Sequence, residues 1–212
     1  MSYRVQEIFP TLQGEGARTG TPAVFLRFSG CNLWSGRESD RAQAVCRFCD
    51  TEFASADGRE GGVYPDAESL ADAVASHRNV SGGPRWVVCT GGEPLLQLDA
   101  PLIDALKERG FLVAVETNGT LAAPEGLDWI CVSPKAGAKW VQHSGHELKV
   151  VWPQAFALSE LQSLPFEHFF LQPQDASDPE VRERHLRATV QEVMANPLWR
   201  LSLQTHKLIG IP

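Results

Sequence analysis

Six short apolar runs, separated by glycine, proline and polar residues, set the strongest limit on how this chain can fold. They cover residues 23–28, 86–89, 112–115, 129–132, 148–151 and 169–171. Continuous apolar runs of this length are typical of strands buried on both faces, as in parallel sheets. Segments with helical periodicity lie between some of them, at residues 66–77, 98–109, 156–164 and 179–195. This alternation predicts an α/β fold built from βα units.

The lengths of the connections between the apolar runs indicate whether the βα units can form a complete barrel. The segments after Thr117 and after Val132 contain glycine and proline and are too short for full crossover helices. A closed eight-unit barrel is therefore not expected. The pattern predicts a partial, open βα barrel with about six parallel strands and some shortened crossover helices. With 212 residues and no internal repeat, residues 1–212 are expected to form a single domain.

Charge and hydropathy exclude several classes of partner. The chain has 26 acidic and 19 basic residues, a net charge of -7 and no run of lysine or arginine, so nucleic acid is not expected as a partner. No apolar stretch is long enough to span a membrane, and the first residues lack the order of a signal peptide. We therefore expect a cytoplasmic protein without a membrane partner. In that reducing compartment, five cysteines suggest metal binding or packing more than disulfides.

Polar or glycine-rich residues follow five of the six apolar runs directly. These segments are residues 29–31, 90–94, 116–119, 133–135 and 172–175. In βα sheets, ligands bind where strands end at their carboxyl edge, because loops and helix N-termini converge there. The sequence therefore predicts that the functional residues gather at one end of the sheet.

Three cysteines are spaced as metal ligands. Cys46 and Cys49 form a C-x2-C pair, and Cys31 precedes Cys46 by fourteen intervening residues. Cys89 and Cys131 lie within apolar runs and are interpreted as packing residues. From the cysteines alone, a structural zinc site completed by a histidine is as good an interpretation as an iron–sulfur cluster. A cluster with three protein ligands leaves one iron open to a cofactor, so the choice depends on whether a cofactor site accompanies it.

A turn after the second apolar run supplies such a site. In the sequence Thr90-Gly91-Gly92-Glu93-Pro94, the paired glycines allow backbone groups to approach a ligand, and Glu93 offers an acceptor for an amino group. Glycine and proline before a helix are common on their own. Downstream of the three cysteines in a βα protein, the same residues indicate a cofactor site.

Together, the cysteines and residues 91–94 resemble the radical S-adenosylmethionine superfamily. The resemblance implies that Cys31, Cys46 and Cys49 bind a 4Fe–4S cluster. It also implies that S-adenosylmethionine chelates the open iron and is cleaved to a 5′-deoxyadenosyl radical. The spacing differs from the family pattern, because fourteen residues instead of three separate the first two cysteines. A cluster loop over residues 31–49 is expected.

The N-terminal residues 9–16, Phe-Pro-Thr-Leu-Gln-Gly-Glu-Gly, narrow the resemblance to the 7-carboxy-7-deazaguanine synthases of queuosine and deazapurine biosynthesis. The likeness continues through Arg27 to the C-terminal tail. It implies a lyase that contracts the ring of 6-carboxy-5,6,7,8-tetrahydropterin. The radical removes hydrogen from C6, the hydrogen is later returned to regenerate S-adenosylmethionine, and ammonia is lost.

The resemblance also implies roles for individual residues. Substrate would contact Leu12, Gln13, Gly14, Glu15, Arg27, Thr90, His206 and Pro212, the last two in a tail of residues 204–212. S-adenosylmethionine would contact Phe48, Asp50, Gly91, Gly92, Glu93, Glu116, Asn118, Ser133, Pro134, Lys135, Gln172, Pro173, Gln174 and Asp175. Thr51 would bind Mg²⁺. From the residues alone, Arg27 could instead form a structural ion pair, Thr51 could cap a helix, and the tail could be disordered.

Two other functions compete with this one. A glycyl-radical-enzyme activase would need a wide mouth for a partner protein and would not use residues 11–16 or an ordered tail. A non-catalytic zinc-binding module would leave the polar strand ends unexplained. The family resemblance further implies a homodimer and an electron donor such as flavodoxin.

Overall fold

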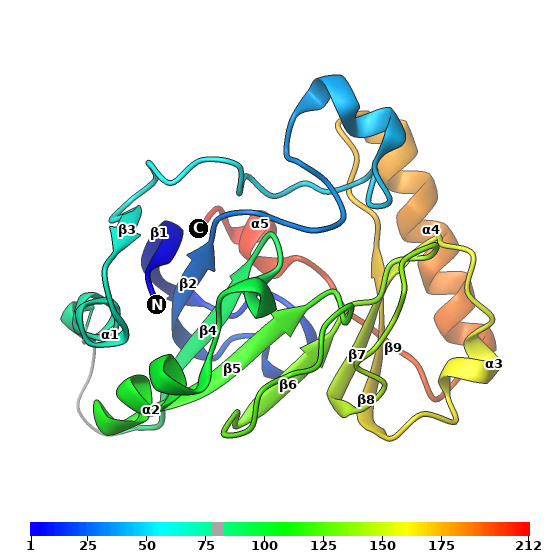
Figure 1. Ribbon diagram of the computed structural model, residues 1–212. Helices are drawn as coiled ribbons and strands as arrows, with labels where there is room; N and C mark the ends of the chain where they lie inside the picture. Colours follow the sequence, from blue (N-terminus) through cyan, green and yellow to red (C-terminus); the bar gives the residue numbers. More distant parts are fainter. Residues whose placement is uncertain (78–82) are drawn as a thin grey trace.

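The computed structural model describes residues 1–77 and 83–212, and its strands form one mixed sheet (Figure 1). The sheet has nine strands in the order β3-β1-β2-β4-β5-β6-β7-β8-β9. Their bounds are Tyr3–Leu12, Pro22–Phe28, Gly62–Tyr64, Arg85–Gly91, Phe111–Thr117, Trp129–Val132, Gly145–Trp152, Phe166–Pro173 and Arg200–Leu201 for β1 to β9. Because β3 and β9 end the series without pairing to each other, the sheet is open.

All six predicted strands are present, and they correspond to β2 and β4 to β8. From β2 to β9 every neighbouring pair is parallel, whereas β1 is antiparallel to both β2 and β3. The predicted open α/β barrel is therefore confirmed, with three additional strands. The sequence pattern missed β1 because polar residues and Pro10 interrupt its apolar positions, and it missed β3 and β9 because they are very short.

The four predicted helices are also present. They are α1 (Ala67–Ser76), α2 (Ala100–Glu108), α3 (Leu158–Leu161) and α4 (Pro179–Ala195). Aspartates cap three of them: Asp66 accepts from Ser69 N, Asp99 from Leu102 N, and Asp178 from the start of α4. A fifth, α5 (Thr205–Ile209), lies in the tail, and three short 3₁₀ turns are η1 (Gly16–Arg18), η2 (Glu38–Gln43) and η3 (Pro94–Leu96).

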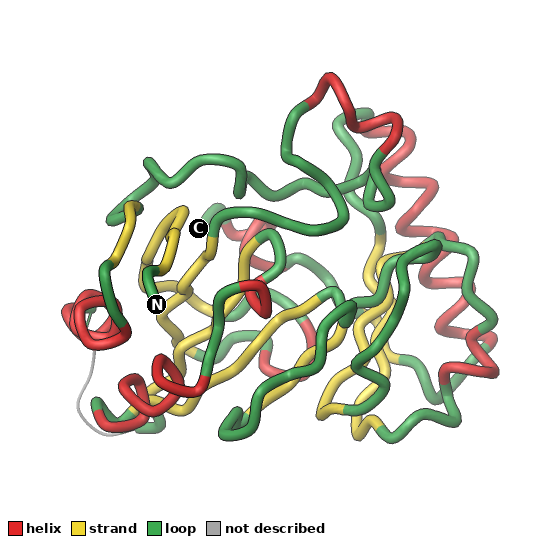
Figure 2. The backbone as a smooth tube through the Cα atoms, viewed as in Figure 1, coloured by secondary structure: helices red, strands yellow, loops and turns green. Residues whose placement is uncertain are grey.

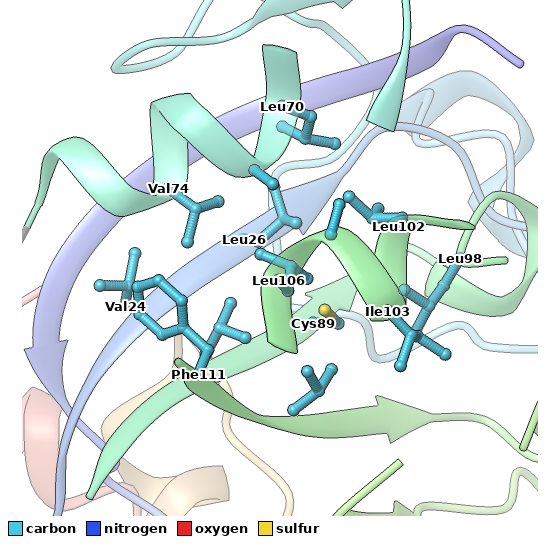
Figure 3. Packing of buried hydrophobic residues seen from close by; sticks show 14 of the residues in the cluster. Val24, Leu26, Leu70, Val74, Cys89, Leu98, Leu102, Ile103, Leu106 and Phe111 are labelled. Carbon is cyan, nitrogen blue, oxygen red and sulfur yellow. The ribbon is translucent and has the colours of Figure 1, made fainter. Parts of the chain in front are cut away.

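The main hydrophobic core lies between the sheet and the helices α1 and α2 (Figure 3). Leu70 and Val74 of α1 and Leu102 of α2 are fully buried against Leu26 of β2 and other strand residues. A second core joins β6, β7 and β8 to α3 and to Trp199. These two cores hold the parallel strands in register, so their carboxyl ends meet at one edge.

Long loops extend from that edge (Figure 2). Between β2 and β3, only η2 interrupts an irregular segment of more than thirty residues, which contains the three ligand-spaced cysteines. No helix separates β5 from β6 or β6 from β7, as the short connections predicted. None of the helices in the two described ranges combines the length and apolar character needed to cross a bilayer.

Candidate active site

A cavity of about 480 Å³ opens at the carboxyl end of the parallel strands. Its walls come from the ends of β1, β2, β4, β5, β7 and β8, from the loop after β2, and from the C-terminal tail. A volume of this size accommodates small-molecule ligands. The predicted concentration of functional residues at one edge of the sheet agrees with the position of this cavity.

Cys31, Cys46 and Cys49 all line the cavity. The Cys31 sulfur accepts a hydrogen bond from Leu33 N at 3.4 Å, although burial raises the pKa of its thiol. A hydrogen bond from Cys46 lowers the pKa of Cys49 to about 6, against the opposing effect of burial, so one thiolate forms readily. Three such thiols on one cavity are the donor set that an iron–sulfur cluster requires.

Within residues 1–77 and 83–212, no three His, Cys, Asp or Glu side chains are grouped so that they could hold one metal ion. In an iron–sulfur cluster, each thiolate binds a different iron, so the ligands surround a larger body. The three cysteines therefore fit a cluster in their chemistry, and none of them is tied up in a disulfide.

Arg41, which lies in η2, anchors the residues inserted between Cys31 and Cys46. Its Nη1 donates to the carbonyls of Arg47 and Cys49, both at 3.0 Å, and its guanidinium lies 3.9 Å from the ring centroid of Trp34. Trp34 in turn packs edge-on against Phe53. The inserted residues thus fold back and brace the segment that carries the C-x2-C pair.

The turn after β4 approaches the cysteine loop closely. Gly92 packs so tightly against the carbonyl of Gly30 that a Cβ there would overlap it, and Glu93 N donates to the same carbonyl at 2.9 Å. The Glu93 side chain is fully buried. Its oxygens accept hydrogen bonds from Thr117 Oγ1 and Asn118 N, both at 2.7 Å, so it ties β4 to the end of β5.

Acidic and amide side chains line the deep part of the cavity. Glu116 at the end of β5 accepts a hydrogen bond from Gln13 Nε2 at 2.7 Å. Lys149 of β7 contacts both Glu15 (2.6 Å) and Glu116 (2.9 Å). Gln204 donates to Glu15 at 3.0 Å. The N-terminal string, two strands and the tail therefore meet in one hydrogen-bonded network.

Arg27 provides a cation on another wall. Its Nε donates to Glu7 at 2.8 Å, and its guanidinium lies 6.0 Å from the ring centroid of Phe9. The structural ion pair that the sequence left open is thus present. Nevertheless Arg27 lines the cavity and is paired in register with Thr90, which lines it too. One edge of the guanidinium is held by Glu7, and its Nη groups are the part available to an anion.

The C-terminal tail is ordered and closes one side of the cavity. Thr205 N donates to the Gly14 carbonyl at 2.9 Å, and the absence of a Gly14 side chain makes room for the His206 ring. The Pro212 carbonyl accepts a hydrogen bond from Thr11 Oγ1 at 2.8 Å. Because His206 and Pro212 both line the cavity, the interpretation of the tail as disordered is wrong.

Lys207 connects this tail to two loops of the opposite wall. Its Nζ lies 2.6 Å from Asp50, next to Cys49, and 2.6 Å from Asp175, after β8. Beside them, Lys135 Nζ donates to Ser133 Oγ at 2.8 Å, and burial lowers the pKa of Lys135. The cysteine side of the cavity is therefore rich in charged and polar groups that could hold a zwitterionic ligand.

Comparison with known proteins identifies the family. Residues 40–149 match the model of the radical SAM superfamily. The chain is 59% identical to the 7-carboxy-7-deazaguanine synthase of Bradyrhizobium diazoefficiens and 58% identical to that of Bordetella pertussis, over the full length of each protein. The chain belongs to the 7-carboxy-7-deazaguanine synthases. It also superimposes on the crystal structure of QueE from Escherichia coli with a TM-score of 0.69 and 27% identity, covering 96% of this chain and 94% of the other.

Membership of this synthase family confirms the prediction of a radical S-adenosylmethionine enzyme with an iron–sulfur cluster. It also decides between the functions that competed at the level of the sequence. A chain that is 58–59% identical to 7-carboxy-7-deazaguanine synthases over their full length is neither a glycyl-radical-enzyme activase nor a zinc-binding module.

Most residues that the sequence assigned to the site of this synthase line the cavity. Besides the residues described above, the predicted site residues that line it are Leu12, Phe48, Thr51, Gly91, Asn118, Gln172 and Pro173. Glu93, Pro134 and Gln174 do not line it. For Glu93 the reason is plain, since its carboxylate is turned into the protein. Glu116, which the resemblance assigned to S-adenosylmethionine, lines the cavity and accepts a hydrogen bond from Gln13 of the N-terminal string.

Several lining residues were not predicted from the sequence, and among them Lys149, Lys207 and Gln204 each make two polar side-chain contacts. A signal for Lys149 was available, because a lysine inside the otherwise apolar run 148–151 has to find a buried partner. Lys207 and Gln204 lie in the tail, where no periodic pattern distinguishes a docked segment from a free one.

Proposed function

We propose that this chain converts 6-carboxy-5,6,7,8-tetrahydropterin to 7-carboxy-7-deazaguanine with loss of ammonia, using S-adenosylmethionine catalytically. One observation carries the proposal: the three cysteines and the Gln13, Glu15, Arg27 and His206 side chains line the same cavity. A radical formed on the cysteine side would therefore lie beside a substrate bound on the other side.

The side of the cavity that carries the cysteines would bind the cluster and S-adenosylmethionine. Cys31, Cys46 and Cys49 would hold the cluster, which supplies the electron that cleaves S-adenosylmethionine. Ser133, Lys135 and Asp175 would bind the methionine and ribose groups of the cofactor, as would Asp50, Gln172 and Asn118. Gly91 and Gly92 let the turn after β4 pack against the end of β2 and the start of the cysteine loop, since a Cβ at either position would overlap the Phe28 or Gly30 carbonyl.

The opposite side suits a carboxylated pterin. The carboxylates of Glu15 and Glu116 are acceptors for the N–H groups on the pyrimidine edge of the pterin. Arg27 is a forked donor for the substrate carboxylate, and Thr90 lies beside it in register. Gln13, His206 and the terminal Pro212 would close the remaining edge. These walls would shield the reacting carbon from part of the solvent.

Thr51 is our candidate ligand for Mg²⁺. It lines the cavity two residues beyond Cys49, and its hydroxyl together with a substrate carboxylate and water would give the hard oxygen ligands that Mg²⁺ prefers. The alternative interpretation as a helix cap is wrong, because residues 51–61 contain no helix. Chelation of Mg²⁺ should then raise KM for the pterin more than KM for S-adenosylmethionine.

The proposal extends to partners and location. Five cysteines without a disulfide, three of them assigned to an oxygen-sensitive cluster, suit the reducing cytoplasm. A small electron donor such as flavodoxin would reduce the cluster. We also propose a homodimer, supported by the exposed apolar side chains of Val190, Met194 and Leu198 on and after α4.

An anaerobic assay tests the proposed reaction. The reconstituted enzyme is mixed with 6-carboxytetrahydropterin, S-adenosylmethionine, Mg²⁺ and a reductant, and products are identified by mass spectrometry. We expect 7-carboxy-7-deazaguanine in excess over the S-adenosylmethionine consumed. Absence of both this product and 5′-deoxyadenosine, with the cluster intact, would refute the substrate assignment.

Removing the charge of Lys207 should loosen the tail. Lys207→Met breaks the pairs with Asp50 and Asp175, which are partly exposed and together contribute about 1 kcal/mol. We expect KM for the pterin to rise about 5-fold, with little change in kcat. Amide hydrogen exchange should become faster in α5. The control is Arg187→Met, which removes an exposed pair with Glu183 on α4. Equal rates of amide exchange in α5 for both variants would contradict the conclusion that the ion pairs of Lys207 hold the tail in place.

A further inference from the structure

Lys149 is a buried lysine whose charge is shared between two carboxylates at the floor of the active-site cavity. It is 3% exposed, and its Nζ lies 2.6 Å from Glu15 Oε2 and 2.9 Å from Glu116 Oε2. A buried ammonium group is stable only when partners of opposite charge surround it. Here it has two such partners, so this trio carries one net negative charge.

Side-chain amides of two glutamines donate hydrogen bonds to the other oxygen of each carboxylate. Glu116 Oε1 accepts from Gln13 Nε2 at 2.7 Å, and Glu15 Oε1 accepts from Gln204 Nε2 at 3.0 Å. Gln13 Oε1 is held in turn by Glu15 N at 3.0 Å. Both carboxylates are therefore fixed in orientation, with Lys149 between them.

The strand register explains why these groups meet. Glu116, Cys131 and Glu147 are paired across β5, β6 and β7, so they form one row on the inner face of the sheet. Lys149 lies two residues beyond Glu147 on the same face. The ends of β5 and β7 thus place Lys149 against Glu116, while the chain leaving β1 brings Glu15 from the other side.

Other titratable groups face this trio. Glu147 accepts from Ala17 N at 3.0 Å, and burial raises its pKa, as it does the pKa of Cys131. Arg18 and Glu147 line the same small pocket, whereas Lys135 and His206 line the active-site cavity.

The charge of Lys149 decides how Glu15 ionises. Burial by itself raises the pKa of Glu15, but the attraction of Lys149 and hydrogen bonds from Lys149 and Gln204 lower it to about 2. Two carboxylates that share a dry site without a cation cannot both ionise. Without Lys149 the pair would retain one proton in mildly acidic solution, and one acceptor would become a donor.

We propose that Lys149 is a positioning residue that holds Glu15 and Glu116 as a pair of ionised acceptors and thereby selects ligands by their N–H donors. This inference rests on the proposed function. A 2-amino-4-oxopyrimidine edge presents an amino group and a ring N–H to such a floor. A 2,4-dioxo edge presents a carbonyl oxygen instead, and the repulsion between this oxygen and a carboxylate would exclude it.

Ligand binding by the reconstituted holoenzyme tests the role of Lys149. The probes are 6-carboxypterin, an oxidised and unreactive form of the substrate, and 6-carboxylumazine, which carries oxygen in place of the 2-amino group. Their dissociation constants are measured by fluorescence between pH 5 and 7 for the wild type, Lys149→Met and Lys149→Arg. Lys107→Met, which removes a partly exposed lysine paired with Asp128, is the matched control.

We expect the wild type to bind 6-carboxypterin at least about 100-fold more tightly than 6-carboxylumazine. Lys149→Met should weaken binding of 6-carboxypterin about 10- to 100-fold at pH 5. The ratio of the variant and wild-type dissociation constants should fall as pH rises, because the retained proton is then released. Lys149→Arg should restore most of the affinity.

Several results would overturn the inference. A folded Lys149→Met variant with wild-type affinity at all pH values would do so, as would a loss that does not change with pH and leaves the preference for pterin intact. If Lys149→Met does not fold, the measurement on the wild type still tests the inference. Equal affinity of the wild type for the two probes would refute the selection of ligands by the Glu15 and Glu116 carboxylates. Failure of the wild type to bind either probe would count against the proposed substrate itself.

Discussion

The Cys49→Ala variant is expected to lose the iron–sulfur cluster and, with it, all product formation. Cys49 is one of three cysteines that line the cavity, and a cluster already open at one iron would be left with two protein ligands. Iron and acid-labile sulfide should fall to background after anaerobic reconstitution. Turnover and formation of 5′-deoxyadenosine should both fall to the background of the assay.

Cys89→Ala is the matched control for this variant. Cys89 is fully buried in the hydrophobic core on β4 and does not line the cavity. Its removal leaves a small void that costs about 1 kcal/mol of stability, while the cluster content should stay at the wild-type level. A Cys49→Ala variant that retained a complete cluster and turnover would show that Cys49 is not a ligand.

The Arg27→Ala variant should retain the cluster and cleavage of S-adenosylmethionine but bind the pterin poorly. The loss of a forked charge-assisted contact to a carboxylate corresponds to about 3 kcal/mol, so kcat/KM should fall about 100-fold. Most of the effect should appear in KM. Glu7, which loses its partner in this variant, is about one-third exposed and can be solvated.

Arg85→Ala controls for the loss of an arginine from the same sheet. Arg85 begins β4 at the opposite end from the cavity, where it donates to the Arg109 carbonyl at 2.9 Å and packs near the Phe111 ring. Its removal should change stability without raising KM for the pterin. Unchanged pterin KM in Arg27→Ala would refute the role of Arg27 and leave only its ion pair with Glu7.

The sequence predicted the frame of this molecule because its signals are local. The apolar runs that became β2 and β4 to β8 are buried on both faces, so their composition is distinctive without knowledge of their neighbours. In β1, polar residues and Pro10 interrupt the apolar positions, so its pairing with β2 was not visible. The cysteines were identifiable by spacing, but their metal became clear only from the residues around them.

The finer arrangement of the site depends on contacts between distant segments. Glu93 was expected to face a ligand, yet Thr117 and Asn118 from the next strand occupy its carboxylate. Glu116 is oriented by Gln13, which lies more than one hundred residues earlier in the chain. Lys149 joins segments 134 residues apart when it contacts Glu15. Such partners are set by tertiary packing, and no local pattern encodes them.

The central claim is that one cavity holds the pterin C6 next to the 5′ carbon of S-adenosylmethionine. The most direct test uses 6-carboxytetrahydropterin labelled with deuterium at C6, with anaerobic turnover followed by mass spectrometry of the recovered S-adenosylmethionine. We predict that deuterium appears in S-adenosylmethionine while its total amount stays nearly constant. Formation of 7-carboxy-7-deazaguanine with entirely unlabelled S-adenosylmethionine would contradict the claim.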